Sequence, residues 1–219
     1  SALDIGNLHH GCAWLYAVAQ KPSTPASSIR FSQWIDENCQ ELHDYGVDVV
    51  HAWGMTEMSP LGSLGSIKPQ YAHLSGSEKL DLQEKQGFAP FGVEMKITDD
   101  ENKEHPWDGE TFGRLKVRGP AVASSYFGGA GAEQFDEENW FDTGDVATMD
   151  SDGYMIIRDR SKDIIKSGGE WISTVELEDI AMSHPDIAQA AAIAAKHPKW
   201  DERPVVIAVK RSGDVTEAD

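Results

Sequence analysis

Residues 140–173 read WFDTGDVATMDSDGYMIIRDRSKDIIKSGGEWIS, and the character of the sequence changes within this stretch. On its N-terminal side apolar residues alternate with polar ones, which is typical of β-strands. On its C-terminal side Ser173 and Glu176 form a capping box, which predicts the start of a helix. Between the two, cations alternate with acids, and two glycines follow at 168–169, where a backbone without side chains can bend or let another group pass. We therefore place a boundary between two structural units near residues 159–162.

The segment before this boundary predicts an antiparallel sheet or a small barrel. Residues 93–98 and 114–118 alternate in hydrophobicity, and turn residues follow the first of them. A second pair, 145–148 and 154–157, is separated by an Asp-Ser-Asp-Gly turn. This turn faintly resembles a calcium loop, but it lacks the flanking ligand positions and the distal Glu. A hairpin turn is the better interpretation.

Further towards the N-terminus the pattern changes to that of an α/β unit. Residues 31–45 carry apolar side chains at three- and four-residue spacing, which predicts a helix, and residues 47–53 form a β-rich run. The loop 54–57 then follows at the C-terminal end of this strand, where open α/β sheets place their ligands. Residues 60–87 are rich in Gly, Ser and charge, so we interpret them as surface connection with a short helix around 77–85.

The C-terminal part predicts a separate α+β unit. Pro185 ends the helix that begins after Ser173, and residues 190–195 and 205–210 look like two strands. The predicted fold class is thus α/β plus an antiparallel, β-barrel-like subdomain, followed by part of a small α+β domain. We expect one domain over residues 1–159, divided into an α/β piece at 31–87 and a β-rich subdomain at 88–159, and a second domain over 160–219.

The chain is strongly acidic, with 37 acidic and 19 basic residues and a formal net charge of −18. Such a surface repels phosphate backbones and anionic lipids, which argues against nucleic acid as a partner. It does not exclude a nucleotide ligand, because salt screens charges beyond about 8 Å. No run of about 18 apolar residues and no signal-peptide pattern occurs, which favours a cytoplasmic protein without a transmembrane segment.

Two short motifs place a carboxylate where it can do chemistry. Thr56 and Glu57 follow a predicted strand, where Thr56 can donate to a phosphate oxygen and Glu57 can bind Mg²⁺ through hard carboxylate oxygens. Taken alone, the pair is more typical of a bland surface loop. Asp145 lies at the start of a predicted strand and can accept hydrogen bonds from a ribose diol, although a simple turn is also possible.

Residues 158–173 strongly resemble the signature of the adenylate-forming superfamily, which includes acyl-CoA synthetases, beetle luciferases and peptide-synthetase adenylation domains. Residues 53–57 look like its aromatic-Gly-x-Thr-Glu motif, and residues 140–145 like its Thr-Gly-Asp motif. The surrounding sequence looks most like medium-chain fatty-acid CoA ligases, at 90–93, 117–120 and 196–204.

The resemblance implies roles for the residues of the large domain. Thr56 would contact the nucleotide phosphate as a catalytic residue, and Glu57, also catalytic, would hold Mg²⁺. Asp145 would bind the ribose hydroxyls of ATP or AMP. Trp53 and Gly54, from the same motif as Thr56, would belong to the nucleotide site.

The resemblance also implies roles around the boundary. Arg160 would contact ribose and phosphate, and Lys162 would be the hinge about which a small C-terminal lid rotates. Lys166, as a third catalytic residue, would line the approach of the CoA thiol. The glycines Gly168 and Gly169 would line the same passage, and Trp171 would contact CoA.

The implied reaction joins a fatty acid or another carboxylate to CoA at the expense of ATP. The carboxylate attacks the α-phosphate of ATP, giving acyl-AMP and pyrophosphate, and the CoA thiol then displaces AMP. The family's Ser/Thr/Gly-rich phosphate loop and the lysine near the end of its lid are not in this sequence. We therefore expect an incomplete C-terminal portion of such a ligase that is inactive by itself. Two alternatives stay open: a non-catalytic nucleotide-binding or interaction module with the same fold, and an acyl-AMP ligase that passes its product to a carrier protein.

Overall fold

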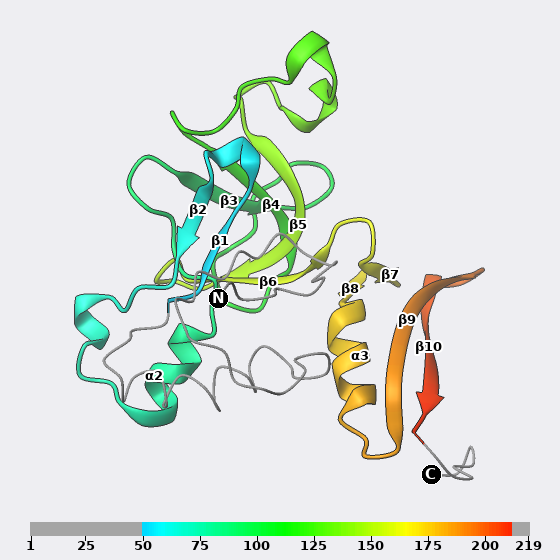
Figure 1. The fold of residues 1–219 in the computed structure, drawn as a ribbon. Coiled ribbons are helices and arrows are strands. Elements are labelled where there is room, and N and C mark those ends of the chain that lie inside the picture. Colours follow the sequence, from blue (N-terminus) through cyan, green and yellow to red (C-terminus); the bar gives the residue numbers. More distant parts are fainter. Residues whose placement is uncertain (1–49, 212–219) are drawn as a thin grey trace, which may run out of the picture.

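A computed structural model describes residues 50–211 of the chain, except for the side chain of Leu80. The helix predicted at 31–45 and residues 47–49 of the strand predicted at 47–53 lie outside these residues. Within them, Figure 1 shows a larger β-rich unit with its strands β1–β6 and, beside it, a smaller unit that contains β7–β10 and the helix α3. The antiparallel subdomain and the α+β unit of the predicted fold class are both present.

The main sheet of the larger unit is antiparallel and follows chain order. Its strands are β3 (Glu94–Thr98), β4 (Gly113–Arg118), β5 (Phe141–Met149) and β6 (Met155–Arg160). The alternation at 93–98 and 114–118 therefore predicted two real strands that pair with each other. The Asp-rich turn connects β5 to β6, as the hairpin interpretation requires. It closes with hydrogen bonds from the backbone N–H groups of Asp152 and Tyr154 to Asp150 Oδ1.

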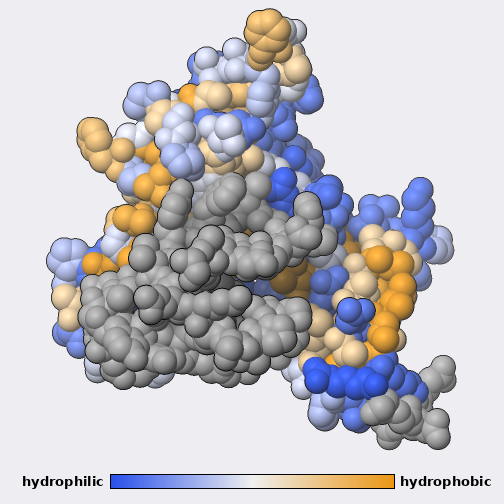
Figure 2. Space-filling model, viewed as in Figure 1, coloured by the Kyte–Doolittle hydropathy of each residue, from blue (hydrophilic) through white to orange (hydrophobic). Residues whose placement is uncertain are grey.

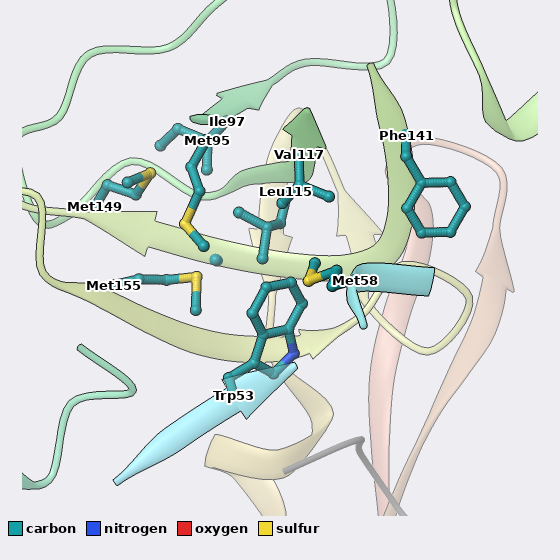
Figure 3. Packing of buried hydrophobic residues seen from close by; sticks show 10 residues of the cluster. Trp53, Met58, Met95, Ile97, Leu115, Val117, Phe141, Met149 and Met155 are labelled. Carbon is teal, nitrogen blue, oxygen red and sulfur yellow. The ribbon is translucent and has the colours of Figure 1, made fainter. Parts of the chain in front are cut away.

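A two-stranded ribbon packs across this sheet and encloses the core. The ribbon consists of β1 (Ala52–Gly54) and β2 (Leu61–Leu64). Isolated bridges from Phe88 to β2 and from Gly87 to β6 extend the hydrogen bonding between ribbon and sheet. Trp53 points from β1 into the centre of the buried cluster (Figure 3). The side chains of this cluster are those of Trp53, Met58, Met95, Ile97, Leu115, Val117, Phe141, Ala147, Met149 and Met155.

The connection between β2 and β3 is more structured than predicted. It contains the 3₁₀ helix η2 (Pro69–Tyr71) and the helix α2 (Gly76–Gln83), which confirms the short helix expected around 77–85. Hydrogen bonds from Gln70 and Tyr71 to the Asp152 carboxylate tie η2 to the β5–β6 turn. The loop between β4 and β5 carries two more 3₁₀ turns, η3 (Phe127–Gly129) and η4 (Ala132–Gln134).

The smaller unit consists of a four-stranded sheet and the helix α3. Its strand order is β8-β7-β10-β9, built from β7 (Ile165–Ser167), β8 (Glu170–Ile172), β9 (Ile187–His197) and β10 (Asp201–Lys210). The helix α3 (Thr174–Met182) begins at the predicted cap, where Ser173 Oγ accepts a hydrogen bond of 3.2 Å from the Glu176 N–H. The two predicted strands are longer than their patterns indicated.

The surface of the smaller unit includes a band of apolar side chains. Figure 2 shows hydrophobic colour over the β9–β10 hairpin, whose exposed apolar residues include Ile193, Val205, Ile207 and Val209. Within residues 50–211, no helix has the length and apolar character needed to cross a membrane.

Candidate active site

Asp145 is the centre of a buried polar cluster. Its side chain is 1% exposed, and its two oxygens accept hydrogen bonds from the Trp53 indole (3.2 Å) and the Arg160 guanidinium (2.6 Å). Arg160 is the last residue of β6 and lies opposite Asp145 in the strand register. Burial raises the pKa of the Asp145 carboxyl, and the bonds from Arg160 and Trp53 oppose this increase.

A β-bulge aims Asp145 at this cluster. Lys116 of β4 lies opposite Asp142, whereas Arg114 lies opposite Val146, so residues 143–145 share the space of one β4 residue. Thr143 Oγ1 donates a hydrogen bond of 2.9 Å to the Leu115 carbonyl, so this β4 carbonyl has a partner where the pairing of the strands is interrupted. Such bulges redirect side chains next to functional sites.

The glycine in the middle of this bulge allows its geometry. Gly144 has a φ of 74°, a left-handed conformation that glycine adopts without the strain of a Cβ atom. The sequence-based placement of Asp145 at the start of a strand was wrong. The strand begins at Phe141, and Asp145 lies inside it, directed by a pairing irregularity that the local pattern does not reveal.

Thr56 and Glu57 form the first turn after β1. They belong to the 3₁₀ helix η1 (Thr56–Met58), whose third residue, Met58, is buried in the core and anchors the turn. Thr56 is exposed, and Glu57 is partly buried. The Glu57 main-chain carbonyl accepts a hydrogen bond of 2.7 Å from the Ala123 N–H, and its carboxylate Oε1 accepts one of 2.7 Å from the Tyr126 hydroxyl.

A second group of predicted residues lies on β7 and β8. The Lys166 ammonium forms an ion pair with Asp100, in the turn after β3, and lies 4.7 Å from the centre of the Trp171 ring. Lys162 is 77% exposed at its side chain, in the connection between β6 and β7. Among residues 50–211, no hydrogen bond or ion pair directly joins this group to the Trp53–Asp145–Arg160 cluster.

Gly168 and Gly169 form the turn of the β7–β8 hairpin. Their φ values are 61° and 93°, which suit a two-residue hairpin connection that requires positive φ at both positions. A Cβ on Gly168 would lie 2.6 Å from the Trp200 ring, whereas a Cβ on Gly169 would meet no atom within 4 Å. The hairpin turn by itself therefore explains the two adjacent glycines. The sequence-based interpretation as a ligand passage did not consider this reason.

The predicted boundary at residues 159–162 is crossed by buried contacts. Asp159 Oδ2 accepts hydrogen bonds from the Thr174 N–H (2.6 Å) and hydroxyl (2.8 Å), so it caps α3 from β6. Ser173 Oγ also donates to the Arg158 carbonyl at 2.8 Å. The smaller unit is thus fastened to the end of β6 at the first turn of its helix.

Tyr126, Asp100 and Asp159 take part in these contacts and were not among the predicted site residues. Asp159 follows Arg158 in a stretch that the sequence did single out. Tyr126 and Asp100 reach their partners Glu57 and Lys166 across 69 and 66 residues of sequence, so no local pattern indicates them.

The side chains around Glu57 suit Mg²⁺ held by one carboxylate better than a metal ion held entirely by protein ligands. Among the described residues, no group of three or more His, Cys, Asp or Glu side chains is arranged to hold a metal ion. Mg²⁺ typically binds through one or two carboxylates, several waters and substrate phosphates rather than in an all-protein cage. A single carboxylate next to an exposed threonine hydroxyl is compatible with that mode.

The β-rich unit followed by a small α+β unit matches part of the fold of solved adenylate-forming enzymes. The chain belongs to the AMP-binding enzyme family, whose sequence model matches residues 17–127, while the model of the AMP-binding enzyme C-terminal domain matches residues 176–219.

Individual relatives agree with this assignment. The chain is 58% identical over 176 residues to 3-methylmercaptopropionyl-CoA ligase of Ruegeria lacuscaerulensis, which covers 80% of this chain and 32% of that protein. It is 54% identical over 210 residues to medium-chain-fatty-acid–CoA ligase of Ectopseudomonas oleovorans, with 95% and 36% covered.

A solved structure of o-succinylbenzoate coenzyme A synthetase from Bacillus subtilis, in complex with ATP and a magnesium ion, is also similar. Its TM-score is 0.62 at 27% identity, over 82% of this chain and 35% of that chain. The chain spans about a third of the length of these relatives.

Proposed function

We propose that this chain contributes nucleotide-binding residues and part of the mobile lid to an ATP-dependent ligase that joins a carboxylic acid to CoA. The reaction has two steps, formation of acyl-AMP with release of pyrophosphate, and displacement of AMP by the CoA thiol. The observation that carries the proposal is the contact of Trp53, Asp145 and Arg160 around one buried carboxylate. Membership of the AMP-binding enzyme family supports it.

Asp145 and Arg160 are the proposed ribose and phosphate contacts. A carboxylate oxygen that accepts from Arg160 keeps lone pairs that can accept from a ribose hydroxyl. Trp53 acts through its hydrogen bond to Asp145, because its ring packs among the apolar side chains of the core. Gly54 lets β1 pass close to Pro60, since a Cβ there would lie 1.9 Å from the Pro60 carbonyl oxygen.

Thr56 and Glu57 are the proposed contacts for the phosphates and for Mg²⁺. Thr56 donates its hydroxyl to a phosphate oxygen, and Glu57 holds the cation through its carboxylate. Bound Mg²⁺ supplies stabilisation of the charge that develops on the phosphate oxygens. The orientation of the Glu57 carboxylate by its protein partners therefore matters for this role.

The residues beyond β6 are proposed to serve the second step. Lys162 is the hinge, which fits its exposed position between the two units. Lys166 and Trp171, which lie against each other on the β7–β8 hairpin, would flank the approach of the thiol with Gly168 and Gly169 at the turn.

The acid is proposed to be a fatty acid or another small aliphatic carboxylate. Support comes from the relatives named for medium-chain fatty acids and for 3-methylmercaptopropionate. These two names already describe different acids, so the proposal is limited to the class.

Saturation-transfer NMR of ATP and AMP with the purified chain and Mg²⁺ tests the nucleotide role, because it detects weak binding and reports which ligand protons lie near protein. We expect transfer to the ribose protons in the wild type and in the control Asp163→Asn. In Asp145→Asn, losing a charged hydrogen bond should weaken binding by about tenfold or more. Absence of transfer in the folded wild type, or unchanged ribose signals in Asp145→Asn, would contradict the proposal.

A further inference from the structure

The Glu57 carboxylate is held by a loop from elsewhere in the chain. The loop between β4 and β5 contacts Glu57 twice, through the main chain at Ala123 and through the Tyr126 hydroxyl, each at 2.7 Å. These bonds fix both the backbone and the side chain of Glu57. Its position therefore depends on a segment outside the motif that contains it.

Tyr126 itself is firmly anchored. Its ring makes edge contacts with Phe135 and Phe141, at centroid distances of 6.0 Å and 6.4 Å. The loop folds tightly over the ring at Gly131, where a φ of 64° is combined with a backbone so close that a Cβ would lie 2.9 Å from the ring. The hydroxyl thus has little freedom to move away from Glu57.

The hydrogen bond leaves one carboxylate oxygen available. Tyr126 occupies Oε1, and no hydrogen bond to Oε2 is formed within the described part of the chain. Mg²⁺ requires near-octahedral geometry at about 2.0–2.1 Å, whereas Ca²⁺ accepts bidentate carboxylates and more ligands. A carboxylate with one oxygen engaged presents a single, directed ligand atom, which suits the smaller ion.

Resting on the function proposed above, we propose that Tyr126 is a positioning residue that presents Glu57 Oε2 to a divalent cation as a monodentate ligand and so favours Mg²⁺ over Ca²⁺. Outer hydrogen bonds of this kind orient metal-binding side chains, and their loss typically costs 10–100-fold in affinity or activity.

The test compares two tyrosine variants of the full chain. Tyr126→Phe removes the hydroxyl and keeps the ring packing, and Tyr71→Phe is a matched control that removes another tyrosine–carboxylate bond, that of Tyr71 with Asp152 at 2.5 Å. ATP binding is measured by saturation-transfer NMR during titrations with MgCl₂ and with CaCl₂. Urea unfolding of each variant reports its stability independently of any ligand.

We expect Tyr126→Phe to weaken Mg²⁺-dependent ATP binding by about 10–100-fold and Ca²⁺-dependent binding less, so that the Mg²⁺/Ca²⁺ preference falls. Tyr71→Phe should keep the wild-type preference even if it loses stability. A wild-type preference and affinity in Tyr126→Phe would overturn the positioning role. Glu57→Gln separates this failure from that of the proposed function, because unchanged Mg²⁺ dependence in Glu57→Gln overturns the metal role of Glu57 itself. A wild-type chain without Mg²⁺-dependent ATP binding overturns both.

Discussion

At the scale of single residues, Asp145 shows how a functional carboxylate is held in a core. Burial disfavours its charge, while Arg160 at 2.6 Å and the Trp53 indole at 3.2 Å favour it. The net effect is a raised pKa, with burial as the larger influence. The pKa of such a group changes when a ligand changes its access to water, as is expected of a residue in a binding site.

The raised pKa of Asp145 predicts a specific pH dependence of stability. An unfolded Asp loses its proton near pH 3.9, whereas folded Asp145 keeps its proton to a higher pH. The folded state therefore binds more protons in this window, and its free energy of unfolding falls as the pH rises. Asp145→Asn lacks this contribution. The free energy of unfolding of the wild type minus that of Asp145→Asn should therefore decline from about pH 4 upwards.

Urea unfolding at a series of pH values measures this difference. The control is Asp163→Asn, at a carboxylate with 40% of its side chain exposed. If the difference in free energy of unfolding between wild type and Asp145→Asn instead increases with pH, the hydrogen bonds to Asp145 lower its pKa more than burial raises it.

At the scale of secondary-structure elements, the sequence predicted what depends on neighbours along the chain. Alternation gave β3 and β4, and the Ser173–Glu176 pair gave the start of α3. The bulge in β5 was missed because it depends on how β5 pairs with β4, which no local pattern encodes. Strands of three residues, such as β7 and β8, are too short to show any periodicity.

The candidate site divides in the same way. Asp145 and Arg160 were predicted from a resemblance to known motifs, and the structure brings them into contact. The partners Tyr126 and Asp100 come from loops whose positions are set by packing across the sheet, such as the contact of Tyr126 with Phe141. Tertiary contacts between distant segments were therefore the part that sequence patterns could not supply.

The β7–β8 hairpin predicts different effects for its two glycines. Gly169→Ala should cost about 1–2 kcal/mol, because only its left-handed backbone is strained. Gly168→Ala should cost a further 1–3 kcal/mol or so, because the new Cβ would lie 2.6 Å from the Trp200 ring and the ring must move. Urea unfolding and amide hydrogen exchange of β7 and β8 measure the two effects. Equal losses in both variants would argue against packing on Trp200 as the reason for glycine at 168.

At the scale of the whole molecule, several contacts hold the small unit against the large one. Asp159 caps α3, Lys166 is paired with Asp100, and Arg158 pairs with Glu176 at 3.1 Å. A lid that rotates about Lys162 has to break the contacts that cross its path. These polar contacts would therefore have to break before the proposed lid could rotate.

The final prediction concerns catalysis by the chain as it stands. Thr56, Asp145 and Arg160 are expected to contact the nucleotide and Glu57 to hold Mg²⁺, but the sequence contains neither the phosphate loop nor the terminal lysine that the resemblance requires. Losing a single preorganised donor typically costs 10²–10³ in rate, so losing a whole loop together with a lysine should reduce turnover below detection.

The assay supplies a medium-chain fatty acid, ATP, Mg²⁺ and CoA, and mass spectrometry follows acyl-AMP and acyl-CoA. The medium-chain-fatty-acid–CoA ligase of Ectopseudomonas oleovorans serves as the active reference. Product that requires both ATP and CoA, and that disappears in Glu57→Gln, would show that these 219 residues suffice for the reaction. In that case phosphate binding and charge stabilisation would have to come from groups within this chain.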